Sequence, residues 1–205
     1  MKGIEISYRL GIIVLLIIVV SIIGFYFSVG CSVLTGNSLS YTSPNLSPPQ
    51  SASTGQIQFL FPRAGGNAEG LLCSCINTAT SSIDIAIYSI TLDSVKLALI
   101  KEKAEGTKIR ILTDAQQSGG KYQEALLTQL KTLGIPVKKN KHSGLMHLKM
   151  TIVDSKLVTT GSYNYSTAAS SINDEVFVVI IDPVVVQKSK TEFERLWASS
   201  GFEDF

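Results

Sequence analysis

One stretch decides the fold: Leu145-Met-His147-Leu-Lys149-Met-Thr-Ile-Val-Asp154. His147 and Lys149 stand two apart in a run where they alternate with apolar residues. On a β-strand successive side chains point to opposite faces, so both polar groups leave the same face while the apolar ones turn to a core. The pattern therefore predicts a buried strand that aims an imidazole and an ammonium at one point.

The residues that follow predict a hairpin. Residues 154–156 (Asp-Ser-Lys) are typical of a tight turn, and residues 157–160 form the return strand. This return brings Gly161, Ser162 and Asn164 back toward the start of the first strand. One short hairpin thus gathers a His, a Lys, an amide, a hydroxyl and a glycine that allows close backbone approach.

This set of side chains suits chemistry on a phosphodiester. Attack on phosphorus adds negative charge to the equatorial oxygens, which a Lys and neutral donors stabilise, while a His attacks or transfers a proton near neutral pH. A lone His-x-Lys is far more often the exposed end of a strand. The complete pattern is what favours phosphoryl transfer.

The pattern resembles the signature of the phospholipase D superfamily, and its fixed positions are His147, Lys149, Asp154, Gly161, Ser162 and Asn164, followed by Glu175 at the distance seen in small bacterial nucleases. Residues 82–89, 108–114 and 192–197 are similar to further elements of that fold. The resemblance covers about residues 56–205. The motif occurs once, whereas the larger phospholipases carry two copies.

The resemblance implies roles for these residues. It makes His147 the nucleophile that forms a phosphohistidine, with Lys149 and Asn164 on the non-bridging oxygens. It implies a catalytic set of His147, Lys149, Asp154, Asn164 and Glu175. Because Asp154 is an odd number of residues from His147, we expect it to leave the other face or the turn, in a role more structural than chemical.

Other residues complete the expected site. Ser162 and Gly161 belong to substrate binding, and Glu175 or its neighbour Asp174 is expected to accept a hydrogen bond from the second nitrogen of His147. Asp114, after a predicted strand, is a candidate to line the cleft where α/β proteins bind ligands. The resemblance calls for no metal and no cofactor.

The lysine-rich segment before the motif is a candidate contact for substrate. Lys138, Lys139 and Lys141 are expected in a loop that places positive charge at the mouth of the site. The alternative is a solvated loop without a ligand. Net charge does not decide, because 18 Lys and Arg stand against 16 Asp and Glu.

Two function classes remain open, both as phosphodiester hydrolases. The first is a non-specific endonuclease on DNA or RNA, favoured because single-motif members with so short a domain resemble such enzymes. The second is a membrane-surface phospholipase D, favoured by the N-terminal segment. The family's chemistry uses two histidines and His142 lacks the motif's partners, so we expect a homodimer that brings two copies of His147 to one phosphorus.

The N-terminal part is expected to anchor the chain. Residues 1–9 form a cytoplasmic stub, and residues 10–30 are an uncharged apolar run long enough to span a bilayer. A cleaved signal peptide or lipidation at Cys31 are the alternatives. Lys2 and Arg9 precede the span, so the catalytic domain is expected outside the cytoplasm, at the cell membrane or, after cleavage, secreted or periplasmic. Residues 31–55 read as a flexible Ser/Thr/Pro linker.

The catalytic domain, residues 56–205, is expected to be α/β, with helices on both faces of a mixed sheet. The predicted strands cover 57–61, 82–88, 107–113, 135–139, the hairpin 147–160 and 175–181. The predicted helices cover 69–80, 92–105, 119–133, 164–170 and 183–198. Cys73 and Cys75 are expected as small buried side chains in the first of these helices.

Overall fold

A computed structural model describes residues 55–205. The chain divides into two compact units, residues 1–50 and 51–205, and only the second is described below. The expected stub, membrane span and linker, residues 1–55, lie outside the described residues except for Gly55. Within residues 55–205, no helix has the length and apolar character needed to cross a membrane.

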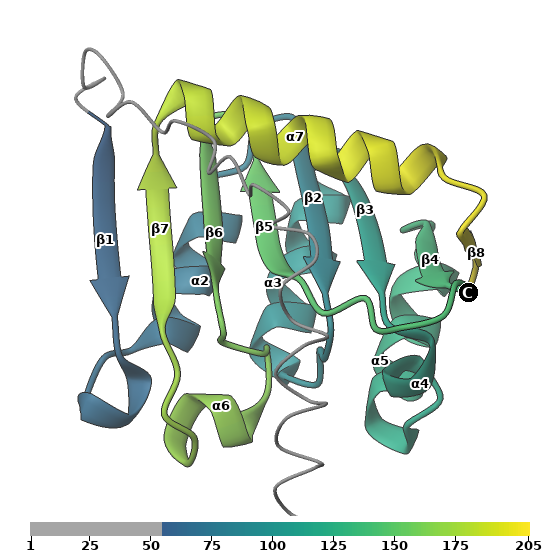
Figure 1. Ribbon diagram of the computed structural model, residues 1–205, viewed down its shortest axis with the longest axis horizontal. Helices are drawn as coiled ribbons and strands as arrows, with labels where there is room; N and C mark the ends of the chain where they lie inside the picture. Colours follow the sequence, from purple (N-terminus) through teal and green to yellow (C-terminus); the bar gives the residue numbers. More distant parts are fainter. Residues whose placement is uncertain (1–54) are drawn as a thin grey trace, which may run out of the picture. The chain divides into compact units, whose positions relative to one another are not determined.

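The unit is built on one mixed sheet of eight strands (Figure 1). Its order is β1 (Gln56–Leu60), β7 (Phe177–Ile181), β6 (Leu157–Gly161), β5 (Lys149–Val153), β2 (Ser82–Ile87), β3 (Lys108–Thr113), β4 (Val137–Asn140) and β8 (Phe202–Asp204). Only β2, β3 and β4 run parallel to one another; every other neighbouring pair is antiparallel.

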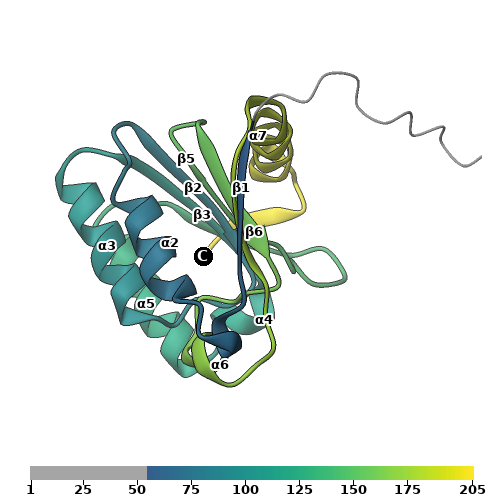
Figure 2. The ribbon, with the colours of Figure 1, turned by 90° about the vertical axis from the view of Figure 1, so that its left-hand side faces the viewer.

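Helices cover both faces of the sheet, as the alternation of apolar patterns predicted (Figure 2). One face carries α2 (Ala68–Ile76), α3 (Asp93–Ala104) and α5 (Lys121–Thr132), and the other carries α7 (Pro183–Ala198). Alternation along each strand feeds two cores. In β2, Ile83, Ile85 and Ile87 face the three helices. Ala86, with Met150 of β5, packs beneath α7.

The motif forms the expected hairpin, with β5 and β6 paired from Thr151–Thr159 to Val153–Leu157. Asp154 and Ser155 at its tip have φ of 52° and 53°. Positive φ at both central residues matches the twist of a two-residue hairpin turn. The strand starts at Lys149 rather than His147, and Leu148 is consequently 39% exposed instead of facing a core.

Several other segments differ from the sequence prediction. The helix expected over 69–80 ends at Ile76. The helix expected over 119–133 is present as α5, while α4 (Ala115–Ser118), separated from it by Gly119 and Gly120, was not predicted. The short helix expected over 164–170 is α6 (Thr167–Ser171). Neither η1 (Pro62–Ala64) nor β8, whose three residues are held by pairing with β4, was predicted.

Candidate active site

The motif residues other than Asp154 gather at one end of the sheet, where the directions of the strands bring several strand ends together (Figure 1). β1, β2, β3 and β6 end at this edge, while β5 and β7 begin there. The ends of parallel strands are where α/β proteins bind ligands. Tyr88 follows β2, His147 precedes β5 and Ser162 follows β6, so the topology alone brings them to a common edge.

His147, Lys149 and Tyr88 form the centre of this edge. The Lys149 Nζ lies 3.1 Å from Nδ1 and 3.0 Å from Nε2 of His147, and donates to the His147 backbone oxygen at 3.0 Å. The Tyr88 ring lies 4.6 Å from the imidazole, and the Lys149 ammonium lies 4.9 Å from the Tyr88 ring centroid. The same-face arrangement predicted from the sequence is therefore present in the structure.

The imidazole and the ammonium differ in exposure. Lys149 is only 6% exposed, whereas His147 is open to solvent. Burial lowers the pKa of the Lys149 ammonium below its usual range, and the charge of Glu175 acts in the opposite direction. An ammonium held in a poorly solvated place attracts an incoming anion more strongly than one in water.

Gly161 and Ser162 are fixed by the strand that follows them. Gly161 has φ of 133°, and a Cβ there would lie 2.1 Å from the Val176 backbone oxygen, so only glycine fits. The Ser162 hydroxyl donates to Glu175, and the Val176 N–H donates to the Ser162 oxygen at 3.1 Å. Both motif residues are thereby locked against β7.

The two carboxylates expected to orient His147 have other partners. Glu175 accepts from Ser162 and, at 3.2 Å, from Asn173 Nδ2. Asp174 accepts from Arg63 at 2.7 Å. Glu175 nonetheless lies close enough to act on the charge of Lys149. Its place is thus beside the ammonium and the hydroxyl, rather than behind the imidazole.

Asn164 holds a buried polar atom that lacks a partner. Its Oδ1 is buried and, among residues 55–205, receives no hydrogen bond. Leaving such an atom unpaired costs about 1–3 kcal/mol. The amide is therefore poised to gain from a ligand or a partner subunit, which fits a residue of a binding site better than a residue of a finished core.

The segment that leads to His147 is held from below by Asp114. Its carboxylate accepts from the N–H groups of Gln116 and Gln117 at 3.0 Å, and from Met146 N at 3.0 Å. Asp114 is 1% exposed. Instead of lining a cleft, it ties the start of α4 to the residue immediately before His147, and so positions the imidazole.

Asp154 lies at the other end of β5. Seven residues of extended chain separate it from His147, roughly 20 Å. Its carboxylate accepts from the backbone N–H of Thr80, Ser81 and Ser82 at 2.8 to 2.9 Å and from two of their hydroxyls. Burial alone would raise the pKa of Asp154, but these hydrogen bonds outweigh it and hold the pKa well below its usual range. This position agrees with the structural role expected from the spacing of Asp154. It does not agree with a direct catalytic role.

The prediction of a lysine-rich loop before the motif is wrong for two of its three lysines. Lys138 and Lys139 lie in β4, paired with β3 and β8. The Lys138 ammonium donates to the Trp197 backbone oxygen at 2.9 Å and stacks over that indole ring. Lys139 faces Glu203 at 3.9 Å. Lys141 alone is exposed in the loop that leads to His147.

Both cysteines of α2 are free thiols, and burial raises the pKa of each. Cys75 is buried and Cys73 half-buried, in accord with a packing role. Within residues 55–205, no three His, Cys, Asp or Glu side chains gather as a metal site.

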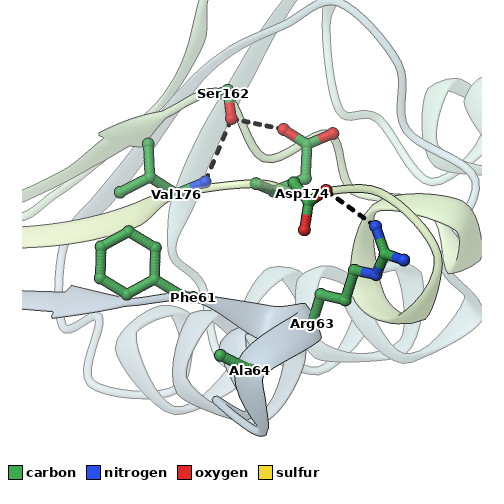
Figure 3. A pocket seen from close by; sticks show the side chains of 7 residues that line it. Phe61, Arg63, Ala64, Ser162, Asp174 and Val176 are labelled. Atoms are coloured by element: carbon green, nitrogen blue, oxygen red, sulfur yellow. Dashed lines mark hydrogen bonds and ion pairs between the residues drawn. The ribbon is translucent and has the colours of Figure 1, made fainter.

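Residues that the motif does not include complete the edge. A pocket of 460 Å³ lies beside Ser162 and Glu175, and its wall is formed by Phe61, Arg63, Ala64, Asp174 and Val176 (Figure 3). Tyr88 and this wall were missed from sequence. The only available signal was indirect: Tyr88 ends a predicted strand, and Phe61 precedes a proline.

Known proteins resemble this chain in both sequence and fold. A family model described as cardiolipin synthase, PLD-like domain, matches residues 72–197. A mitochondrial cardiolipin hydrolase from Chlamydomonas reinhardtii is 29% identical over 122 residues, which are 60% of this chain and 54% of that protein. A phospholipase D from Rickettsia conorii is 36% identical over 107 residues, 52% of each protein.

Among solved structures, the phospholipase D family member Nuc from Salmonella typhimurium aligns with a TM-score of 0.68 at 28% identity. The alignment covers 74% of this chain and 98% of Nuc. The chain thus spans about half the length of the curated relatives it matches, and nearly the whole of Nuc.

Proposed function

The chain belongs to the phospholipase D superfamily, and from that premise we propose that it is a metal-independent phosphodiesterase that hydrolyses nucleic acid. The observation that carries the proposal is the exposed imidazole of His147 set against the buried ammonium of Lys149. One group is available to attack, and the other supplies the positive charge that the reaction needs.

His147 is the nucleophile in this proposal. An imidazole nitrogen forms a bond to phosphorus while the bond to the leaving oxygen breaks, which gives a phosphohistidine and a free alcohol. Lys149 lies against both ring nitrogens in the free protein. A bound phosphate takes over the hydrogen bonds of the ammonium, which frees the attacking nitrogen and stabilises the charge on the equatorial oxygens.

The remaining motif residues position the phosphate. The Asn164 side-chain N–H is a donor for the non-bridging oxygens, the Ser162 hydroxyl joins it by exchanging its bond to Glu175 for one to phosphate, and Gly161 lets the backbone approach. Glu175 holds Ser162 and balances the charge of Lys149. Asp154 acts from a distance by fixing the hairpin on which His147 and Lys149 stand.

A second acid is needed to protonate the leaving oxygen, since one imidazole cannot attack and also hold that proton. Within residues 55–205 the other histidine is His142, which packs edge-on against Phe202 and bonds the Ser143 oxygen. We therefore place the acid on a second copy of this chain, in a homodimer whose two His147 side chains flank one phosphate. The exposure of His147 supports such an arrangement.

Location follows from residues outside the described part. We propose that the apolar segment 10–30 holds the chain on the cell membrane, with the catalytic domain outside the cytoplasm. Tethering both subunits to one membrane raises their effective concentration and favours pairing.

A phospholipid diester is the second candidate substrate, because of an apolar row beside the site. Ile57, Phe59 and Phe61 alternate on one face of β1 and its extension, and each is more than half exposed. Such a row suits contact with a lipid surface. In that case the enzyme acts as a membrane-surface phospholipase D.

One assay separates these functions. The full-length chain in detergent is offered DNA, RNA and vesicles of anionic phospholipid, each in excess EDTA. We expect DNA to be cleaved, because Lys149 supplies the cation that a metal would otherwise provide. Activity that disappears with EDTA and returns with a divalent ion contradicts the mechanism, and cleavage of phospholipid alone contradicts the substrate.

The composite site is tested by mixing subunits. Inactive His147→Ala chains are combined with wild type, and turnover is followed against the mixing ratio. A site that needs both copies of His147 predicts turnover that falls roughly as the square of the wild-type fraction. A straight line means that each monomer works alone.

A further inference from the structure

The pocket beside Ser162 and Glu175 has a use that the motif does not supply. Its volume of 460 Å³ lies in the range of small-molecule sites. Phe61, Ala64 and Val176 give it apolar walls, and Arg63 and Asp174 stand at one side (Figure 3). It is a concave apolar site with few polar groups, directly beside the proposed point of reaction.

The pocket shares two residues with the proposed active site. Ser162 and Glu175 line it and are hydrogen-bonded to each other. Glu175 also acts on the charge of Lys149, which in turn contacts His147. A phosphodiester held by Lys149 and Ser162 therefore has one of its two ester arms beside this pocket.

Phe61 is an exposed aromatic ring on a rigid support. Its side chain is 56% exposed, yet its backbone oxygen accepts from Ala64 N at 3.0 Å and Gly66 N at 3.1 Å. Pro62 follows and fixes the first turn of η1. The ring is thus presented to solvent at little further entropic cost, which suits a stacking surface.

Arg63 is held by a bond that is easily exchanged. Its ion pair with Asp174 at 2.7 Å is open to water, with the two side chains 58% and 84% exposed. Exposed pairs contribute little to stability. The guanidinium is therefore available to a phosphate that arrives at the rim of the pocket.

We propose that this pocket is a subsite for one nucleoside of the nucleic-acid strand, with its base stacked on Phe61 and its next phosphate on Arg63. The inference rests on the proposed function and names the substrate class of that same site. A flat aromatic face with a cation at its rim matches a base and its neighbouring phosphate. A volume of 460 Å³ admits one nucleoside.

The test compares two strands of equal length and charge. One is oligothymidylate, and the other carries tetrahydrofuran abasic units, so that only the bases differ. The full-length wild type and Phe61→Ala are assayed on both in EDTA. We expect Phe61→Ala to lower kcat/KM on oligothymidylate about tenfold and to leave the abasic strand unchanged. Phe61→Trp should restore the preference for bases.

Matched variants fix the interpretation. Phe59→Ala removes an equally exposed ring from the same face of β1 but outside the pocket wall, and should change neither rate. Arg63→Gln should slow both strands, since both carry the phosphate. Thermal melting of Phe61→Ala should match wild type, because the ring is mostly exposed.

The outcomes are distinguishable. If wild type cleaves neither strand, the proposed function fails. If it cleaves both and Phe61→Ala acts equally on both or on neither, the nuclease stands and the subsite is wrong. If Phe61→Ala slows only hydrolysis of phospholipid vesicles, the pocket serves a lipid and the inference is overturned.

Discussion

The polar groups at the two ends of β5 differ in how fully their hydrogen bonds are satisfied. At one end, both oxygens of Asp154 are filled by hydrogen bonds from residues 80–82. At the other, Lys149 is buried against rings and a carbonyl, and the Asn164 oxygen is unpaired. The first arrangement is finished without a ligand and the second is not.

This difference separates stability from function within one motif. Both ends belong to the same sequence signature, yet only the unfinished end gains from a ligand: the Lys149 ammonium gains from an anion and the Asn164 oxygen gains from a hydrogen-bond donor. Residues at the finished end should therefore control folding, and residues at the unfinished end should control turnover. Variants at each end can confirm or break this division.

The largest effect is expected at His147. His147→Asn should reduce turnover by about four orders of magnitude or more, because the covalent nucleophile is lost. The midpoint of thermal unfolding should stay within about one degree of wild type, since the ring is exposed. Turnover is measured on DNA and unfolding by circular dichroism, and near-normal activity would show that another residue attacks.

In a Lys149 variant, activity should fall while stability holds or rises. Lys149→Met is expected to lower kcat by about 10²- to 10³-fold, the size of losing one transition-state donor. The stability should hold or rise, because a poorly solvated charge is removed. Lys188→Met, on the exposed side of α7, serves as control and should alter neither quantity. A strong loss of stability in Lys149→Met would make this lysine structural.

Asp154 is expected to matter for folding only. Asp154→Asn keeps a residue that tolerates the positive φ at this position but removes the charge that accepts these hydrogen bonds. Urea titration at pH 7 should show a loss of about 2–3 kcal/mol, and kcat per folded molecule should not change.

The pH dependence of this loss of stability is a second measurement on the same variant. The pKa of Asp154 is depressed in the folded state, so its contribution is complete above the unfolded value of 3.8 and is lost as the pH falls below it. The gap between wild type and Asp154→Asn should therefore narrow steadily as the pH falls below about 4. A constant gap would mean that the charge is not what stabilises the turn.

The smallest effect is expected from a lysine outside the motif, in the loop that leads to His147. Lys141→Ser should weaken DNA binding slightly and reduce the slope of log K against log salt by about one. Lys156→Ser, remote from the site, should leave that slope unchanged. Equal changes in the two variants would indicate a diffuse charge effect instead of a local phosphate contact.

Sequence predicted what depends on local periodicity. The alternation around His147 and Lys149 placed both on one face, and the hairpin brought Ser162 back to the same edge. It failed where long-range pairing decides. Lys138 and Lys139 lie in a strand and not in a loop because β4 pairs with β3 on one side and with β8, from the end of the chain, on the other.

Contacts between residues of neighbouring strands also could not be predicted from a local sequence pattern. Phe61 comes to the site because β1 pairs with β7, and Tyr88 because β2 pairs with β5. The expected hydrogen bond from His147 to Glu175 was wrong for the same reason. Glu175 accepts instead from Ser162, which the turn after Gly161 brings next to it.

The most direct test of the central claim is to trap the covalent intermediate. The full-length enzyme is mixed with a DNA oligonucleotide, quenched in alkali within milliseconds, and digested for mass spectrometry. The account predicts a nucleotidyl adduct, joined through phosphorus, on the peptide that carries His147, absent in His147→Asn and undiminished by EDTA. An active enzyme with no adduct, or with an adduct on another residue, would contradict it.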